Sequence, residues 1–501
     1  MKKEVKLGAL LSYILIICNS VYGMVIAPYM LGMLGQAEYG VYKTIGSLTA
    51  SMVVLDLGIG GTMQRYIAKF NAEGRRRECS NFAAMGLIQA AGLSVVVASV
   101  CAVLYFRLDA LYAESFLPSE LIRAKEVFLL SSLSLLLSMF ENVINGIISG
   151  LNRFVFSNGL KVVTLFLRAG LIAFVLPLWK SAVAVMTISV AITSIVILLE
   201  LVYLLFCLKM PIRYSYFDKT IFKESSLYTG MMFVQSLTAQ INTNLDNVLI
   251  GSLIGAVAVS VYSFGLTIFG MFQQLSCAIS GVMLPTVTDE LTKGTNHRGM
   301  ENLVIQAGRI QFAILGAAVC GFAVIGKEFA YLWLFDELGE GYRDVWIISM
   351  ILMIPSIWEL SQNVCLSILR AKNLLEFRTM VLILGVILNF LVSYFGTKHY
   401  GYYAAAIGTS ASVIISSLIC MNIYYYKKLK LNVLRIFYHI LRFNLAPLAV
   451  GTVALICFDR LVGQGGFLLF AGKVAVFAVF FGLTLLLSHR DRVGQLLKKI
   501  K

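Results

Sequence analysis

The sequence predicts an all-α integral membrane protein with about fourteen transmembrane helices: two similar six-helix lobes and an added C-terminal pair. Three observations predict this fold. Apolar residues make up 59% of the 501 residues and charged residues only 13%, whereas about a quarter of a soluble chain is charged. Long apolar stretches recur along the whole chain, and short motifs from the first half return in the second half.

The apolar stretches are long enough to cross a bilayer, which takes about 20 residues each. The first, from Leu7 to Leu34, has no charged residue and is about twice as long as a signal-peptide core, so we expect it to remain as a helix. The expected spans are 7–34, 41–67, 80–106, 126–150, 160–178, 181–208, 227–253, 256–285, 304–325, 344–369, 379–396, 401–425, 445–462 and 465–488.

The basic residues support this order of spans. With the N-terminus in the cytoplasm, about two thirds of the 41 Lys and Arg residues fall in cytoplasmic segments, as the positive-inside rule requires. Both termini are therefore expected on the cytoplasmic side of the membrane. The net charge of +15 is a topology signal that also suits an anionic inner leaflet, so we expect membrane lipid and no nucleic acid as a partner.

The internal repeat relates the two halves. Leu31-Gly32-Met33-Leu34-Gly35 returns about 220 residues later as Ile250 to Gly255, and Gly40-Val41-Tyr42 returns as Ser260-Val261-Tyr262. An even number of intervening spans gives the halves the same orientation, which is typical of transporters with a central cavity. We expect an N-lobe at 1–208, a C-lobe at 209–426, and an added pair with a basic tail at 427–501.

Other functional classes are less well supported. The nine cysteines are scattered without a Cys-x-x-Cys pair, which argues against a metal site or disulfide framework. The expected outer loops, about 107–125 and 326–343, are too short for a catalytic domain, and no nucleotide-binding motif is present. We therefore expect a transporter without a cofactor, driven by a coupling ion (H⁺ or Na⁺) or by consumption of its cargo.

Two motifs resemble a known family. Asp56-Leu57-Gly58-Ile59-Gly60 leading to Arg65-Tyr66, and Asn244 to Gly251 leading to Val261-Tyr262, are similar to bacterial polysaccharide transporters, the oligosaccharide-lipid flippases. The resemblance implies a fold like that of MATE multidrug exporters, alternating access, and flipping of a polyprenyl-diphosphate-linked oligosaccharide, with other polysaccharide-assembly proteins as partners. Fourteen spans resemble the lipid II flippase, but Leu7 to Leu34 lacks the arginines that this flippase carries there.

Basic residues inside the spans are candidate cargo contacts, because a charge facing lipid costs several kcal/mol. Arg168 lies about eight residues into a span that starts at the cytoplasm, and it could bind the diphosphate through paired hydrogen bonds or pair with Glu141 in a structural ion pair. Arg65 and Arg309, near the cytoplasmic ends of their spans, could gather the headgroup or extend to water. Lys473, expected in the middle of the membrane, could line a lipid groove or contact the main bundle.

Acidic and amide residues complete the candidate set. Glu141, Glu359, Asp56 and Asp246 could carry a coupling proton or neutralise an arginine, as could Glu200. Glu141 and Glu359 occupy matching spans, next to Asn142 and close to Asn363, and these two amides could join helices or contact sugar hydroxyls.

Four other interpretations remain at this point. A MATE-type exporter of cations and a lipid II flippase share the expected fold. A membrane enzyme such as a glycan polymerase would need catalytic residues on larger outer loops, and a receptor gives no reason for buried charges in both halves.

The topology can be tested by cysteine labelling at positions 75, 219, 293, 430 and 498. All five should be accessible only from the cytoplasm, because each lies in a segment that the basic residues place inside. Labelling of position 219 from outside would overturn the order of the two halves.

Overall fold

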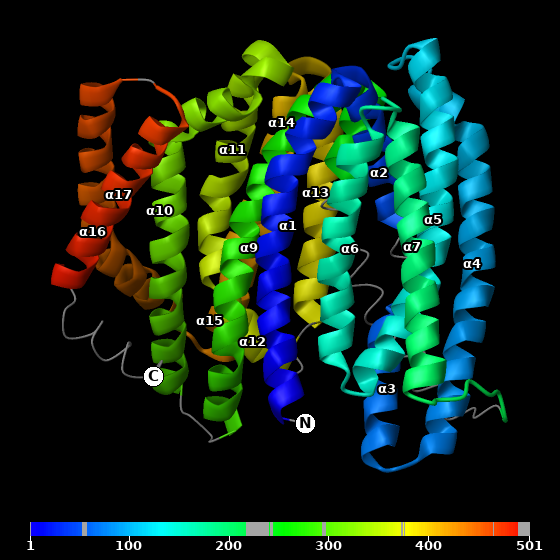
Figure 1. Cartoon of the computed structure of the whole chain (residues 1–501). Coiled ribbons are helices and arrows are strands. Elements are labelled where there is room, and N and C mark those ends of the chain that lie inside the picture. The colour runs from blue at the N-terminus through cyan, green and yellow to red at the C-terminus, as the bar shows by residue number, and fades with distance from the viewer. Residues whose placement is uncertain are drawn as a thin grey trace. The chain divides into compact units, whose positions relative to one another are not determined.

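The computed structural model describes the chain except for residues 1, 53–57, 217–239, 241–243, 293–296, 372–373, 375, 464 and 489–501. The described residues are mostly helical and contain no strand (Figure 1). Residue contacts divide the chain into two compact units, Met1–Ser260 and Val261–Lys501. The all-helical membrane fold expected from the sequence is therefore confirmed. The expected lobe boundaries remain a prediction.

Unit 1 holds the first seven long helices. They are α1 (Lys2–Leu34), α2 (Gln36–Met52), α3 (Ile59–Ala72), α4 (Arg76–Tyr112), α5 (Pro118–Gly150), α6 (Phe154–Val175) and α7 (Ala182–Val202), which continues as a π-helix over Tyr203–Cys207. A further helical segment covers residues 244–253. Side chains from α3, α4 and α5 form one apolar core of this unit, and side chains from α2, α4 and α5 form another.

Unit 2 contains most of α9 (Ala256–Thr292) and all the later helices. These are α10 (His297–Leu338), α11 (Tyr342–Ser361), α12 (Asn363–Ala371), α13 (Glu376–Tyr400), α14 (Tyr402–Val413), α15 (Met421–Leu429), α16 (Val433–Val462) and α17 (Phe467–Ser488), with a π-helix over Ile414–Cys420 between α14 and α15. The pair α16 and α17 packs against α10 in this unit (Figure 1).

Eleven segments among the described residues are long and apolar enough to cross a membrane. One of them, His297–Ser361, is 65 residues long and contains expected span 304–325 and most of expected span 344–369. Expected span 41–67 consists of α2 and α3 on either side of residues 53–57, and span 227–253 lies mostly outside the described residues. The exact count of fourteen therefore remains a prediction.

The long helices extend beyond the expected spans. α10 has 42 residues and is about 63 Å long at about 1.5 Å per residue, roughly twice the hydrocarbon thickness. Much of the two expected outer loops is helical, because α4 continues to Tyr112 and α10 to Leu338. An ion pair of 2.8 Å between Lys125 Nζ and Asp109 Oδ2 joins the extended ends of α4 and α5.

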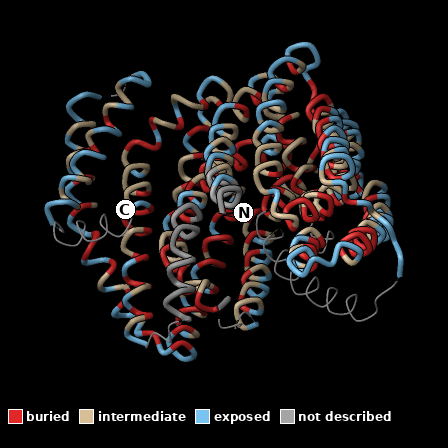
Figure 2. The backbone as a smooth tube through the Cα atoms, turned by 60° about the horizontal axis from the view of Figure 1, so that its bottom comes forward, coloured by how far each residue is buried: buried red, intermediate tan, exposed pale blue. Residues whose placement is uncertain are grey.

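Exposed residues lie along many of the helices (Figure 2), and many of them are large and apolar. Leu468, Leu461 and Phe106 are among many large apolar residues that are mostly exposed. A water-soluble protein rarely carries so much contiguous apolar surface. With the eleven long apolar segments, this surface identifies a multi-pass membrane protein.

Small residues allow close helix packing in unit 1. An added Cβ on Gly146 of α5 would lie 2.3 Å from the carbonyl oxygen of Gly60 on α3, and one on Gly150 would lie 2.8 Å from Ile67 Cβ. Close backbone approach at glycines four residues apart is a common way to join helices in lipid, where the hydrophobic effect does not drive helices together. These two glycines set the distance between α3 and α5.

Capping by a distant residue fixes the start of α7. Ser181 Oγ donates to Glu38 Oε1 at 2.8 Å, and the Ala182 N–H donates to the same oxygen at 2.7 Å. A carboxylate at a helix N-terminus satisfies free N–H groups and interacts favourably with the helix dipole. Glu38 therefore holds the beginning of α2 against the beginning of α7.

A buried ion cluster holds α17 in unit 2. Lys473 is fully buried, and its Nζ lies 2.5 Å from Glu328 Oε2 of α10 and 2.6 Å from Asp459 Oδ1 of α16. The structure thus shows the contact with the main bundle, one of the two roles expected for Lys473. Lys473 is the seventh residue of α17, so it lies nearer a helix end than the expected mid-membrane position.

Replacement of Gly146 by Val should destabilise the fold by about 1–3 kcal/mol, because the added side chain overpacks the contact with Gly60. Gly92→Val is the matched control, since an added Cβ on Gly92 meets nothing within 4 Å. The two variants can be compared by thermal unfolding in detergent. An equal loss of stability in both would show that the close approach is unimportant.

Replacement of Lys473 by Met should cost about 3–5 kcal/mol, because it leaves two carboxylates without their cation. Adding Glu328→Gln to this variant should recover part of the stability, which the same unfolding assay would measure. Lys327→Met, at an exposed neighbouring position, is the control. No loss of stability in Lys473→Met would remove the ion cluster as the attachment of α17.

Candidate functional site

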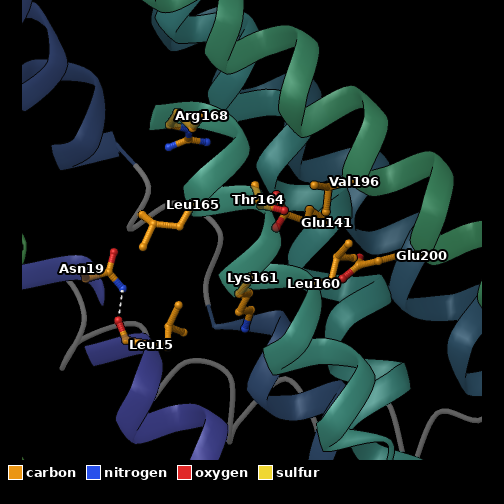
Figure 3. A pocket seen from close by; sticks show the side chains of 10 residues that line it. All are labelled: Leu15, Asn19, Glu141, Leu160, Lys161, Thr164, Leu165, Arg168, Val196 and Glu200. Atoms are coloured by element: carbon orange, nitrogen blue, oxygen red, sulfur yellow. Dashed lines mark hydrogen bonds between the residues drawn. The ribbon is translucent and has the colours of Figure 1, made fainter. Parts of the chain in front are cut away.

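A charged cavity of about 210 Å³ lies inside unit 1 between α1, α5, α6 and α7 (Figure 3). Its lining includes two basic residues, Lys161 and Arg168, and two acidic residues, Glu141 and Glu200. We call it the Arg168 cavity. The remaining lining residues are Leu15, Asn19, Leu160, Thr164, Leu165 and Val196.

One face of α6 supplies both cations. Lys161, Thr164, Leu165 and Arg168 all line the cavity, and their spacing of three, four and seven residues places them on one side of a helix. Lys161 and Arg168 are about 10 Å apart along the helix axis at about 1.5 Å per residue. The cavity therefore carries positive charge at two levels along α6.

The Arg168 guanidinium has no protein counter-ion within the described residues. Its side chain is partly buried, and Nε is shielded from solvent without a hydrogen-bond acceptor. No ion pair joins it to Glu141 in the part of the chain that the structure describes. Figure 3 shows Arg168 separated along the cavity from the acidic side chains. A buried donor without an acceptor costs free energy, which an anionic ligand would recover.

The acidic side of the cavity contains a short polar network. Glu200 is 1% exposed, and its Oε1 accepts a hydrogen bond of 2.9 Å from Asn145 Nδ2. Asn145 Nδ2 also donates to Ser157 Oγ at 2.9 Å, and Lys161 Nζ donates to Asn145 Oδ1 at 3.3 Å. Glu200 Oε2 is buried without a hydrogen-bond donor. Asn145 thus links a basic residue of α6 to an acidic residue of α7.

Glu141 is the second acidic residue of the cavity. It lines the same cavity, is partly buried, and lies within electrostatic range of Lys161 and Arg168. Its carboxylate makes no direct ion pair with either residue among the described residues. Glu141 can therefore balance the charge of the cavity without blocking the cations.

The other predicted cationic and amide contacts lie elsewhere. Arg65 is exposed on α3. Arg309 Nε donates to the carbonyl of His439 at 3.2 Å, and its guanidinium lies 5.1 Å from the Phe443 ring centroid, so it joins α10 to α16. The backbone carbonyl of Asn142 on α5 would lie 2.8 Å from a Cβ added to Gly60 on α3.

The remaining predicted residues of unit 2 make helix contacts. Asn363 Nδ2 donates to Ser276 Oγ at 2.8 Å, which joins α12 to α9. Glu359 is partly buried, and its Oε1 accepts a bond of 2.9 Å from Ser417 Oγ.

Two further acids were expected from the sequence. Asp246, in the helical segment of unit 1, is 2% exposed. Asp56 lies outside the described residues. Neither the substrate roles nor the coupling roles of the predicted residues are tested by these positions.

The sequence analysis did not identify Lys161 or Asn145 as site residues. Lys161 is the second residue of expected span 160–178, where a basic residue is equally compatible with a cytoplasmic loop. Its distance of seven residues from Arg168 is the signal that could have placed both on one face of a helix. No comparable signal marks Asn145, whose role depends on the packing of α5 against α6 and α7.

Comparisons with known proteins agree with this fold. A relative from Salmonella typhi named "Putative O-antigen transporter" is 20% identical over 417 residues, which cover 81% of this chain and 92% of the relative. The lipid II flippase MurJ in an inward closed conformation superimposes with a TM-score of 0.70 at 13% identity, covering 97% of this chain and 99% of MurJ.

A MATE multidrug transporter in an inward-facing conformation has the same fold. It gives a TM-score of 0.58 at 17% identity, with 82% of this chain and 99% of that chain covered. The family model described as "Polysaccharide biosynthesis protein" matches residues 7–289, which is more than half of the chain. The charged cavity lies inside the matched region. Because the match covers more than half of the chain, the chain belongs to the polysaccharide biosynthesis protein family of multi-pass membrane transporters.

Proposed function

We propose that this protein flips an oligosaccharide linked to a polyprenyl diphosphate from the cytoplasmic to the outer leaflet of the bacterial inner membrane. The observation that carries the proposal is the Arg168 guanidinium, which faces a cavity and has no counter-ion among the described residues. Membership of the polysaccharide biosynthesis family and the name of the Salmonella typhi relative support a glycan as cargo.

The diphosphate is the part of the cargo that the Arg168 cavity suits. A guanidinium presents several N–H donors in a planar fork, which matches two phosphate oxygens. Lys161, two turns away on α6, adds a second positive charge nearer the start of that helix. In this proposal the headgroup passes from Lys161 to Arg168 while the lipid tail stays in the bilayer.

The acidic residues serve release rather than binding. A diphosphate entering the cavity brings negative charge close to Glu141 and Glu200, and like charges repel. Uptake of a coupling proton or Na⁺ by these carboxylates would reduce that repulsion. Release of the bound ion would restore the repulsion. The two acids therefore supply a means by which an ion gradient could drive cargo out of the cavity.

The mechanism requires alternating access between two lobes. We assign residues 1–208 and 209–426 to these lobes and residues 427–501 to the added pair, with both termini in the cytoplasm, on the basis of the repeat and the basic residues. Helices with a MATE-like or MurJ-like fold provide the scaffold. Flipping needs no chemical change in the cargo, so no residue is assigned a catalytic role.

Arg168 variants test the proposal directly. Arg168→Ala should lower the flipping rate about 10- to 100-fold, because a charge-assisted hydrogen-bonding contact is worth roughly 1.5–3 kcal/mol. Arg168→Lys should retain part of the activity, since the charge remains but the fork is lost. The measurements are glycan display at the cell surface and the amount of folded protein in the membrane.

Arg123→Ala provides the matched control, because Arg123 lies on the exposed start of α5 and pairs with Glu126. It should leave display unchanged. Normal display with a normal amount of Arg168→Ala protein would exclude Arg168 from transport. Loss of the folded protein together with display would instead indicate a structural role for Arg168.

A further inference from the structure

A second cavity in unit 1 has a different chemistry from the Arg168 cavity. Its volume is about 370 Å³, and its lining comes from α2, α5, α7 and the helical segment that contains Asn244. The two cavities share no lining residue. The volume falls within the range of roughly 300–1,000 Å³ that is usual for small-molecule sites. We call it the Lys43 cavity.

Hydroxyl groups dominate the polar lining of the Lys43 cavity. Ser131, Ser134 and Ser138 occupy one face of α5, at a spacing of three and four residues, and Ser47 and Thr49 lie on α2. Asn244 adds an amide, and Tyr42 adds an aromatic ring. Hydroxyls, an amide and a ring edge or face are groups that can contact a sugar.

Two of these serines keep their hydroxyls free. Serine and threonine in a helix commonly donate to a carbonyl of the preceding turn, as Thr49 does to Ile45 and Ser138 does to Leu135. Within the described residues, Ser131 and Ser134 make no such bond. Ser131 is 4% exposed and its Oγ is buried without a partner. Both hydroxyls are therefore available to a ligand in the cavity.

Lys43 is the single charged residue among the lining residues of this cavity. Its Nζ lies 5.4 Å from the ring centroid of Tyr39 and 6.0 Å from that of Tyr42. No carboxylate forms an ion pair with it in the described part of the chain. Two aromatic rings stabilise a cation partly, but they leave the charge of Lys43 without an anion.

We propose that the Lys43 cavity is a subsite for a sugar that carries a carboxylate, such as a uronic acid. Lys43 would bind the carboxylate, and Ser131 and Ser134 would bind ring hydroxyls of the same sugar. This inference rests on the proposed function, because it assigns the acidic sugar to the glycan of the lipid-linked cargo. It separates recognition of the glycan at Lys43 from recognition of the diphosphate at Arg168.

The test uses the purified full-length protein and two synthetic probes. Each probe is a short polyprenyl diphosphate carrying a disaccharide, and the two differ only in whether the terminal sugar is glucuronate or glucose. Binding is measured by titration of protein in lipid nanodiscs. The wild-type protein should bind the glucuronate probe at least ten-fold more tightly, which corresponds to about 1.4 kcal/mol.

Variants of Lys43 should change this preference alone. Lys43→Gln should bind both probes with the affinity that the wild type has for the glucose probe, and Lys43→Arg should keep a preference for glucuronate. Lys398→Gln is the matched control, because Lys398 also lies over a tyrosine ring, 4.7 Å from the Tyr394 centroid, but lines neither of the two cavities. It should keep the full preference.

Serine variants give a second readout that does not depend on charge. Ser131→Ala should weaken the binding of both probes several-fold, since both carry ring hydroxyls. Ser132→Ala is the control, because Ser132 Oγ also lacks a partner but does not line the cavity. Equal effects of the two serine variants would overturn the assignment of the hydroxyls.

The outcomes separate this inference from the proposed function. Equal wild-type affinity for both probes would overturn the acidic-sugar subsite while leaving lipid-linked glycan as the cargo. If Lys43→Gln lost affinity for both probes equally, Lys43 would be placed at the diphosphate, and this result would also overturn the subsite. Failure of the wild type to bind either probe would overturn the proposed function, and the subsite with it.

Discussion

The cost of placing a charge in an apolar surrounding is the constraint on which the rest of this structure depends. Each ionisable side chain inside a span needs a protein partner, a route to water or a cavity. The charges of unit 2 mostly have partners: Lys473 binds two carboxylates, Arg309 binds a backbone carbonyl, and Ser417 donates to Glu359. In unit 1, Arg168 and Lys43 instead face cavities without a counter-ion among the described residues. The same constraint therefore distinguishes charged side chains that hold helices together from charged side chains that are available to a ligand.

Transport gives a reason for leaving these cations uncompensated. A permanent carboxylate partner would offset the cost of burying Arg168, but it would compete with an anionic cargo for the same donors. Glu141 and Glu200 lie in the same cavity and supply negative charge at a distance, so the cavity can bind an anion and still release it. Asn145 accepts a hydrogen bond from Lys161 and donates one to Glu200, so it stands between these two charged side chains and holds both in place.

The sequence predicts the parts of this fold that depend on local composition. The apolar stretches at α1, α6, α13 and α17 are identified closely, because uniform hydropathy over a span requires no knowledge of its neighbours. The helix ends are less well predicted, since α4 and α10 continue as helices beyond the apolar part. The location of Arg168 within a long apolar helix could be predicted from the apolar stretch around it. The separation of Arg168 from Glu141 could not, because it depends on side-chain direction and on how α5 packs against α6. Lys161 was missed because a residue at the edge of a span is equally compatible with a loop.

The two halves predicted from the sequence share short motifs, but two of their acidic residues have different surroundings. Glu141 and Glu359 lie in spans that the sequence predicts to match, and both are partly buried. Glu141 lines a cavity with two basic residues, whereas Glu359 accepts a hydrogen bond from a serine of its own unit. A duplicated scaffold needs the same helix contacts in both halves, but a cargo with one charged end needs binding groups of one kind at one depth. Different charges in the two predicted halves are therefore what we expect of a transporter whose proposed cargo is charged at one end only.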